Sequence, residues 1–308
     1  MWNGRRYHSL DFYLKQEFGE KLYKLSLDGG MTCPNRDGTL SYGGCIFCSG
    51  DGSGDFAAKK VSDLSDQINT AKSLIYEKYK GERFIAYFQS YTNTYAPVSY
   101  LRNIYMPVIN RKDIEVLDIA TRPDCLSEDT LLLIKELSSI KPVWVELGLQ
   151  TADDKTAALI NRCYKTAVYD KAVDDLHKYG AQVITHMIIG LPHENRETIL
   201  STAKHIANCG SDGIKLQLLH ILEGTRLAQM YRDGVFNALK EDKYISLLCD
   251  IIAILPPQTV IHRLTGDGDK NKLIAPEWSK NKRRVLNHIN HELKKRDIIQ
   301  GCKYFSYS

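Results

Sequence analysis

The alternation of strand-like and helix-like segments constrains the fold of this chain most. Short apolar runs rich in β-branched and aromatic residues are separated by longer segments whose apolar residues recur every three or four positions. The expected strands are residues 22–27, 84–88, 116–120, 143–147, 183–189 and 214–219, with a seventh candidate at 260–265. Repeated strand–helix units predict an α/β fold with a parallel sheet and right-handed crossovers. The periodicity leaves open whether the sheet is doubly wound or curls into a partial barrel.

Local signals indicate where several of the intervening helices begin and end. Residues 61–80 carry one apolar face at three- and four-residue steps. Ser127 is a suitable N-cap for residues 127–140, because acidic residues follow it in the first turn. Residues 171–179 end at Gly180, and residues 199–208 run toward Gly210, both typical helix-stop positions.

Composition excludes several classes of protein without identifying one. The net charge of +4 comes from 41 basic and 37 acidic residues, and eight unevenly spaced cysteines do not form the pattern of a secreted disulfide scaffold. Residues 1–18 lack the apolar stretch of a signal peptide. Residues 247–255 are the most apolar segment, far shorter than the roughly 20 residues that span a bilayer. We therefore expect no membrane association and a cytoplasmic, reducing setting in which free thiols can bind metal.

A loop at residues 31–56, directly after the first expected strand, contains three closely spaced cysteines. Eleven residues separate Cys33 from Cys45, and two separate Cys45 from Cys48. Soft thiolates select zinc, copper(I) or iron–sulfur centres. Three cysteines would leave one iron of a 4Fe–4S cluster open to a cofactor or substrate, whereas a closed zinc site needs four ligands. A zinc site completed by a distant residue such as His8 or Cys125 is the alternative.

These cysteines and the motifs that follow each strand resemble the radical S-adenosylmethionine superfamily. The resemblance extends over about residues 6–289 and is strongest to the branch related to the catalytic subunit of Elongator, which has a widened gap between its first two cluster cysteines. It implies a partial (β/α)6 TIM-type barrel over residues 1–255 and a C-terminal extension over 256–308. It also implies a 4Fe–4S cluster on Cys33, Cys45 and Cys48, S-adenosylmethionine, a 5′-deoxyadenosyl radical, and an electron donor such as flavodoxin or ferredoxin.

The same resemblance assigns a set of residues to cofactor binding. They are Phe47, Gln89, Ser90, Thr92, Arg122, Gln150, Arg162, His186 and Gly190. Phe47 matches a position that borders adenine, and Gly190 one where the backbone approaches adenosine. Gln150 and Arg162 match positions that hold the ribose and carboxylate, and Arg122 suits a carboxylate or phosphate.

Two departures from the family pattern affect this assignment. The second expected strand is followed by Gln89, Ser90 and Thr92 in place of a glycine-rich stretch, so these three residues are placed by position alone. Cys163 and Tyr164 stand where many relatives have Gly-His.

A basic segment near the C-terminus is the main clue to the substrate. Residues 280–303 contain eight basic residues against two acidic ones. Such an excess can follow a phosphate backbone, although it is also typical of a solvated helix. The candidate substrate-binding residues are Arg263, Asp267 and Lys270 after the seventh strand, and Lys282, Arg283 and Arg284 in the basic segment.

The resemblance favours transfer RNA as the substrate. Relatives that lack Elongator's acetyltransferase domain resemble a bacterial group tied to wobble-uridine modification, which implies alteration of the C5 side chain, for example carboxymethylaminomethyl to aminomethyl. Two alternatives remain open. One is a radical enzyme acting on a small molecule such as a porphyrin-type metabolite, and the other is a non-catalytic, zinc-stabilised RNA-binding protein.

Overall fold

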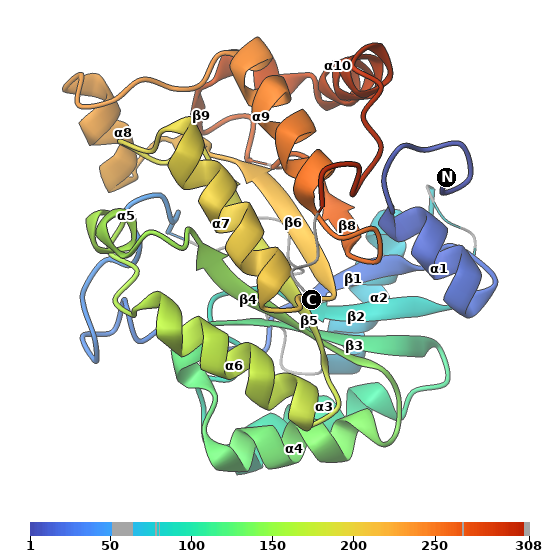
Figure 1. The fold of residues 1–308 in the computed structure, drawn as a ribbon. Coiled ribbons are helices and arrows are strands. Elements are labelled where there is room, and N and C mark those ends of the chain that lie inside the picture. The colour runs from blue at the N-terminus through green and yellow to red at the C-terminus, as the bar shows by residue number, and fades with distance from the viewer. Residues whose placement is uncertain (51–63, 78, 80, 267, 305–308) are drawn as a thin grey trace.

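A curled, parallel β-sheet forms the centre of the computed structural model, which describes residues 1–50, 64–77, 79, 81–266 and 268–304. Its seven strands are all parallel and lie in the order β1-β2-β3-β4-β5-β6-β8. They are β1 (Tyr23–Leu27), β2 (Phe84–Phe88), β3 (Ile114–Thr121), β4 (Val143–Gln150), β5 (Gln182–Ile189), β6 (Gly213–Leu218) and β8 (Val260–Arg263). The strands curl into a half-barrel with helices outside it (Figure 1). The expected partial barrel is confirmed, with β8 as a seventh strand beside the six.

The helices that connect consecutive strands pack their apolar faces on the outside of the sheet. They are α2 (Leu64–Ile75), α3 (Val98–Ile109), α4 (Glu128–Ser138), α6 (Thr166–Lys178), α7 (Arg196–Asn208) and α9 (Glu241–Ile254). The buried residues of these helices and of the strands form one large apolar core. Capping explains the boundaries, because Ser127 accepts a hydrogen bond from Thr130 N and Asn195 accepts one from Thr198 N.

Four further helices and a small second sheet complete the fold. The helices are α1 (Leu10–Phe18), α5 (Asp154–Leu159), α8 (Arg226–Arg232) and α10 (Lys282–Lys295), with 3-10 turns at Pro123–Cys125 and Glu277–Lys280. Strands β7 (Ile221–Leu222) and β9 (Leu273–Ala275) pair antiparallel. Helix α10 buries Val285, Ile289 and Leu293 in the main core beside α9. The expected domain boundary between residues 255 and 256 stays a prediction. None of the helices in the described ranges is long and apolar enough to cross a membrane.

Residues near the two ends of the chain meet at the β8 edge of the sheet. Ile261 N donates a hydrogen bond to His8 O at 2.7 Å, so residues 8 and 9 lie alongside β8. The buried side chain of Gln300 holds this contact in place. Its Nε2 donates to the carbonyl oxygens of Pro256 and Thr259 at 2.7 and 2.8 Å, and its Oε1 accepts from His8 N at 2.8 Å. The edge is therefore covered by the polypeptide that precedes α1.

Candidate active site

The three cysteines of the loop after β1 lie at the carboxyl end of the sheet. Backbone turns fix the loop, since Arg36 N donates to Cys33 O at 2.8 Å and Cys48 N donates to Cys45 O at 3.0 Å. Asn35 Nδ2 donates to Cys45 Sγ at 3.6 Å and to Asn161 O at 2.5 Å, which ties the loop to the turn after α5. Residues 51–56 of the expected loop lie outside the described residues.

A cavity of about 120 Å³ is lined by all three cysteines. Burial, followed by the neighbouring Cys48 and Cys33, raises the pKa of the Cys45 thiol to about 12. A metal centre would have to displace that proton to bind the sulfur. Within the described part of the chain, the three sulfur atoms are not all within 4.8 Å of one another. The donor set and its spread suit a multinuclear iron–sulfur cluster better than one ion.

The structure corrects the alternative of a zinc site completed by His8. His8 Nδ1 lies 3.1 Å from Gln258 O, and both residues line a separate cavity at the amino ends of β5, β6 and β8. His8 is therefore at the opposite end of the strands from the cysteines. Cys125 is not among the described residues that line the cysteine cavity, and its Sγ lies 3.9 Å from Asp124 Oδ1.

Seven of the nine residues expected to bind cofactor line the cysteine cavity. They are Phe47, Gln89, Thr92, Arg122, Gln150, Arg162 and His186. Gln89 Nε2 is buried and has no hydrogen-bond partner among the described residues, so it is available to a bound molecule. In the described part of the chain, Ser90 and Gly190 do not line this cavity: Ser90 is buried, and Gly190 packs against Leu239. The individual cofactor roles stay predictions.

Gln150 ends β4 in a backbone conformation that is rare for a side-chain-bearing residue. Its φ is +63°, and its amide folds back over Gly148, where an added Cβ would lie 2.5 Å from Gln150 Nε2. Tyr164 Oη donates a hydrogen bond to Gly148 O on the same segment. Backbone strain of this kind is common at binding sites, and here it holds the Gln150 side chain at the cavity.

The guanidinium groups of Arg122 and Arg162 lie over the Tyr164 ring, at 5.1 and 4.4 Å from its centroid. Both arginines thus make cation–π contacts with Tyr164, which gives a physical role to one departure from the family pattern. Arg122 is paired with Asp124 through two hydrogen bonds of 2.9 and 2.7 Å.

Arg162 is almost completely buried, and its guanidinium is held by the protein itself. It donates to Leu149 O at 2.8 Å, to Thr151 O at 2.6 Å and to Tyr164 O at 3.0 and 2.9 Å. Asp154 and Thr166 accept further bonds at 3.2 and 3.3 Å. Its part as a ligand of the cofactor carboxylate stays a prediction, and these contacts support a role in positioning the end of β4.

Inside the half-barrel lies an ionic network that the sequence motifs did not reveal. Glu146 on β4 is at its centre and accepts hydrogen bonds from Tyr87 Oη and His186 Nε2, both at 2.7 Å, from Lys24 Nζ at 2.8 Å, and from Lys215 Nζ. Lys24 also donates to Asp118 Oδ2 at 2.5 Å. The available signal was an ionisable residue within a mostly apolar strand, as at Lys24, Asp118, Glu146 and Lys215.

Burial sets the protonation of this network. It lowers the pKa of His186 to about 4, helped by Lys215, so the imidazole is neutral at pH 7. Its Nε2–H then donates to Glu146 while Nδ1 accepts from Gln217 Nε2 at 3.2 Å. Burial also lowers the pKa of Lys215 to about 7, although Glu146 opposes the shift. Lys215 is therefore a buried amine that can exchange a proton near neutral pH.

A larger cavity of about 540 Å³ adjoins the cysteine cavity and shares several lining residues with it, including Phe47, Cys48 and Gln150. Its lining also includes Lys215, His186 and Gln217, together with the expected substrate residues Arg263 and Lys270. Asp267, a third expected substrate residue, lies outside the described residues.

The expected residues of the basic segment lie elsewhere. Lys282, Arg283 and Arg284 are exposed in the first turn of α10, and in the described part of the chain they do not line either cavity. Arg284 and His288 both contact the carboxylate of Glu241. Part of the positive charge of this helix is therefore neutralised within the protein.

Comparison with known proteins agrees with the fold and the cysteine site. The sequence pattern of the Radical SAM superfamily matches residues 33–206, and that of the Radical_SAM C-terminal domain matches residues 211–295. The uncharacterized protein YtqA of Bacillus subtilis is 46% identical over 301 residues, which cover 98% of this chain and 93% of that protein.

More distant similarity leads to proteins of the Elongator type. A tRNA uridine(34) acetyltransferase of Dehalococcoides mccartyi is 30% identical over 155 residues, 49% of this chain and 33% of that protein. The structure of Elp3 from the archaeon Methanocaldococcus infernus superimposes with a TM-score of 0.68 at 17% identity, covering 91% of this chain and 64% of that one.

Proposed function

Because this chain belongs to the radical S-adenosylmethionine superfamily, in the branch that resembles Elp3, we propose that it modifies the C5 side chain of wobble uridine in transfer RNA. Its cofactors are a 4Fe–4S cluster and S-adenosylmethionine. The similarity to a tRNA uridine(34) acetyltransferase supports this substrate, although it covers about half of the chain. The shared fold with archaeal Elp3 is compatible with it.

The cavity residues fit the two cofactors. In this proposal Cys33, Cys45 and Cys48 hold the cluster, and Phe47 borders the adenine. Gln89, whose Nε2 has no hydrogen-bond partner in the described part of the chain, and Gln150 hold the polar groups of the nucleoside. Reduction of the bound cluster would supply the electron that cleaves S-adenosylmethionine and yields a 5′-deoxyadenosyl radical. The protein orients the reactants and excludes water.

The single observation that carries the substrate proposal is the lining of the 540 Å³ cavity beside Cys48. Arg263 and Lys270 provide cationic groups, Lys215 provides a buried amine and Gln217 an amide, all within one cavity that adjoins the cluster loop. Cationic and amide groups suit the carbonyl oxygens of a uracil ring and the carboxylate of a carboxymethylaminomethyl substituent. An electron donor such as flavodoxin or ferredoxin would serve the cluster, and this partner belongs to the proposal.

The decisive experiment compares tRNA from a deletion strain with tRNA from its parent. Mass spectrometry of the nucleosides should show a changed C5-substituted uridine, for example carboxymethylaminomethyluridine accumulating at the expense of aminomethyluridine. The anaerobically reconstituted enzyme should release more 5′-deoxyadenosine with tRNA from the deletion strain than with parental tRNA or none. An unchanged uridine profile together with no stimulation by tRNA would rule the proposal out.

Variants of the cavity test the substrate assignment within the same assay. Arg263→Ala and Lys270→Ala should reduce the tRNA-dependent release of 5′-deoxyadenosine, because each removes a cation from the cavity lining. Lys171→Ala is the matched control, since Lys171 is an exposed cation on α6 paired with Asp175. Stimulation by a porphyrin-type metabolite and not by RNA would support the small-molecule alternative. A colourless protein that binds zinc in place of iron would support the non-catalytic one.

The basic segment contributes, in this proposal, to holding the RNA backbone. The exposed Lys282 and Arg283 at the start of α10 are its candidate phosphate contacts. Replacing both with alanine should weaken tRNA binding and make the negative slope of log K against log salt less steep, by about one unit for each lost phosphate contact. Fluorescence anisotropy at several salt concentrations measures this slope, and an unchanged slope would remove α10 from the RNA surface.

A further inference from the structure

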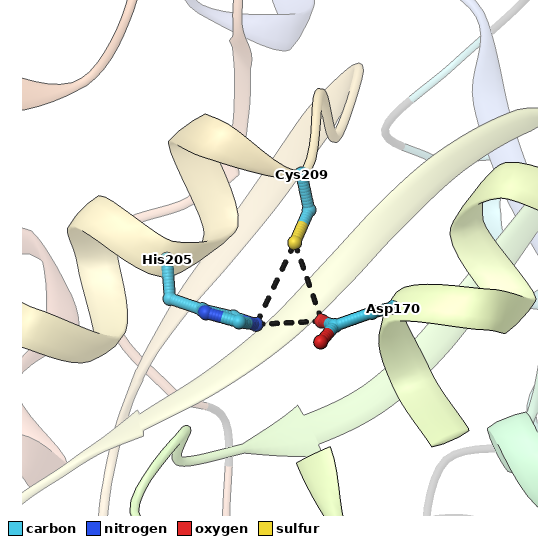
Figure 2. A group of neighbouring side chains, drawn as sticks. All are labelled: Asp170, His205 and Cys209. Carbon is cyan, nitrogen blue, oxygen red and sulfur yellow. Dashed lines mark hydrogen bonds and ion pairs between the residues drawn. The ribbon is translucent and has the colours of Figure 1, made fainter. Parts of the chain in front are cut away.

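A second group of potential metal ligands lies on the outer helices, apart from the cysteine loop. His205, in the last turn of α7, and Cys209, its C-cap residue, are four positions apart and therefore on one face of the helix. Asp170 on α6 faces them (Figure 2). None of these three residues is among the described residues lining the two active-site cavities.

The three donor atoms converge on one point. His205 Nε2 lies 2.6 Å from Asp170 Oδ1, Cys209 Sγ lies 3.3 Å from the same oxygen, and Cys209 Sγ lies 3.5 Å from His205 Nε2. In the described part of the chain, these three side chains form a group of potential metal ligands whose donor atoms all lie within 4.8 Å of one another. The three side chains come from α6 and α7, which are separated in the chain by β5. The fold therefore brings them together.

We propose that Asp170, His205 and Cys209 form a second metal site, which binds one zinc ion. Tetrahedral zinc with bond lengths of about 2.3 Å to sulfur and about 2.1 Å to nitrogen and oxygen requires donor atoms roughly 3.4 to 3.6 Å apart. The two distances that involve sulfur already lie close to this range. The third, between His205 and Asp170, is a hydrogen bond that opens by less than about 1 Å when the ion replaces the shared proton.

The donor set matches zinc in charge and in chemistry. A thiolate, a neutral imidazole and a carboxylate are the three ligand types that zinc uses in proteins. The Cys209 thiol, which donates its proton to Asp170 in the metal-free arrangement, loses that proton to solvent on binding. The thiolate and the carboxylate then balance the two positive charges of the ion. Three protein ligands leave the fourth position for water.

The position of the site indicates a structural role. Cys209 ends α7 just before β6 begins at Gly213, whereas the cluster cysteines lie at the carboxyl ends of the strands. An ion on these ligands would join α6 to α7 on the outside of the half-barrel. Its main effect would therefore be on stability, and the chemistry at the cluster would proceed without it.

The test measures metal content in the cluster-reconstituted protein. After incubation with zinc and removal of unbound metal, we expect one zinc per chain in addition to the cluster iron. Cys209→Ser and His205→Gln should each lose that zinc while retaining the iron. X-ray absorption at the zinc edge should show one sulfur ligand with nitrogen and oxygen ligands, which distinguishes this site from zinc on the three-cysteine loop.

Two control variants separate the proposed site from nonspecific binding. His177→Gln removes a helix histidine paired with Asp212 at 2.9 Å, and Cys302→Ser removes an exposed thiol. Both should retain the zinc. A chelator that leaves the cluster iron in place should lower the melting temperature of the parent protein and not that of Cys209→Ser. Zinc below one equivalent in the parent, or an unchanged zinc content in Cys209→Ser, would overturn the proposal.

Discussion

At the residue scale, Glu194 shows how burial can make a carboxyl group sensitive to pH. Glu194 follows β5, and its Oε1 accepts a hydrogen bond from Thr151 Oγ1 at 2.6 Å. Burial raises the pKa of Glu194 to about 7, and the hydrogen bond from Thr151 only partly offsets this rise. The folded protein therefore binds this proton more tightly than the unfolded chain does.

This shift predicts a pH-dependent effect of Glu194→Gln. A carboxyl group whose folded-state pKa is raised stabilises the fold below its usual pKa, and this contribution is lost as the pH rises through about 7. The variant should match the parent near pH 4 and exceed it at pH 8, by up to about 3 kcal/mol in free energy of unfolding. Denaturant unfolding at both pH values measures the difference. The exposed Glu197→Gln is the control, and an equal gain at both pH values would contradict the explanation.

Functional residues could be predicted from the sequence where they lie close together in the chain. Cys33, Cys45 and Cys48 could be predicted because their spacing lies within one loop. The contacts of Glu146 could not, because Lys24 and Lys215 are 122 and 69 positions away and only the strand register brings them together. Arg162 matched a family motif, but its contacts with nearby carbonyl oxygens depend on how the chain turns after α5.

At the scale of elements, strands were predicted better than helix starts. Each expected strand is present, since short β-branched runs between helices leave few alternatives. Helix α6 begins at Thr166 rather than near residue 171. Its N-cap residue, Lys165, makes no side-chain cap, so the sequence carries no capping signal for this start. Helix α7 begins at Arg196 because Asn195 caps it. Periodic apolar residues identify a helix, whereas its first turn depends on capping.

The turn after β5 leads to a prediction about glycine. Gly190 has a φ of +99°, and an added Cβ would lie 2.9 Å from Leu239 Cδ1. Gly190→Ala should lower the free energy of unfolding by about 1 to 3 kcal/mol, since it adds backbone strain and a steric contact. Gly224→Ala is the matched control, because Gly224 has a φ of +79° with open space around it. Thermal unfolding compares the two, and an equal loss would show that Leu239 adapts without cost.

At the scale of the whole molecule, Gln300 joins parts of the chain that are far apart in sequence. Its side-chain amide donates hydrogen bonds to the carbonyl oxygens of Pro256 and Thr259 and accepts one from the backbone N–H of His8. The side chain is buried, with an exposed fraction of 3%. Gln300→Ala should cost roughly 2 to 4 kcal/mol of stability, because it leaves buried backbone groups without partners. Asn290→Ala, on the exposed face of α10, should have little effect. Chemical denaturation tests both, and a change below about 1 kcal/mol in Gln300→Ala would mean that water replaces the amide.

The covering of the β8 edge also bears on how this protein is made. Residues 8 and 9 leave the ribosome before their partners at β8 and Gln300, which follow some 250 to 290 positions later. During synthesis the first segment therefore waits without its native contacts while β1 to β6 are completed. The cluster cysteines directly follow β1, so they too are synthesised well before the sheet edge is sealed.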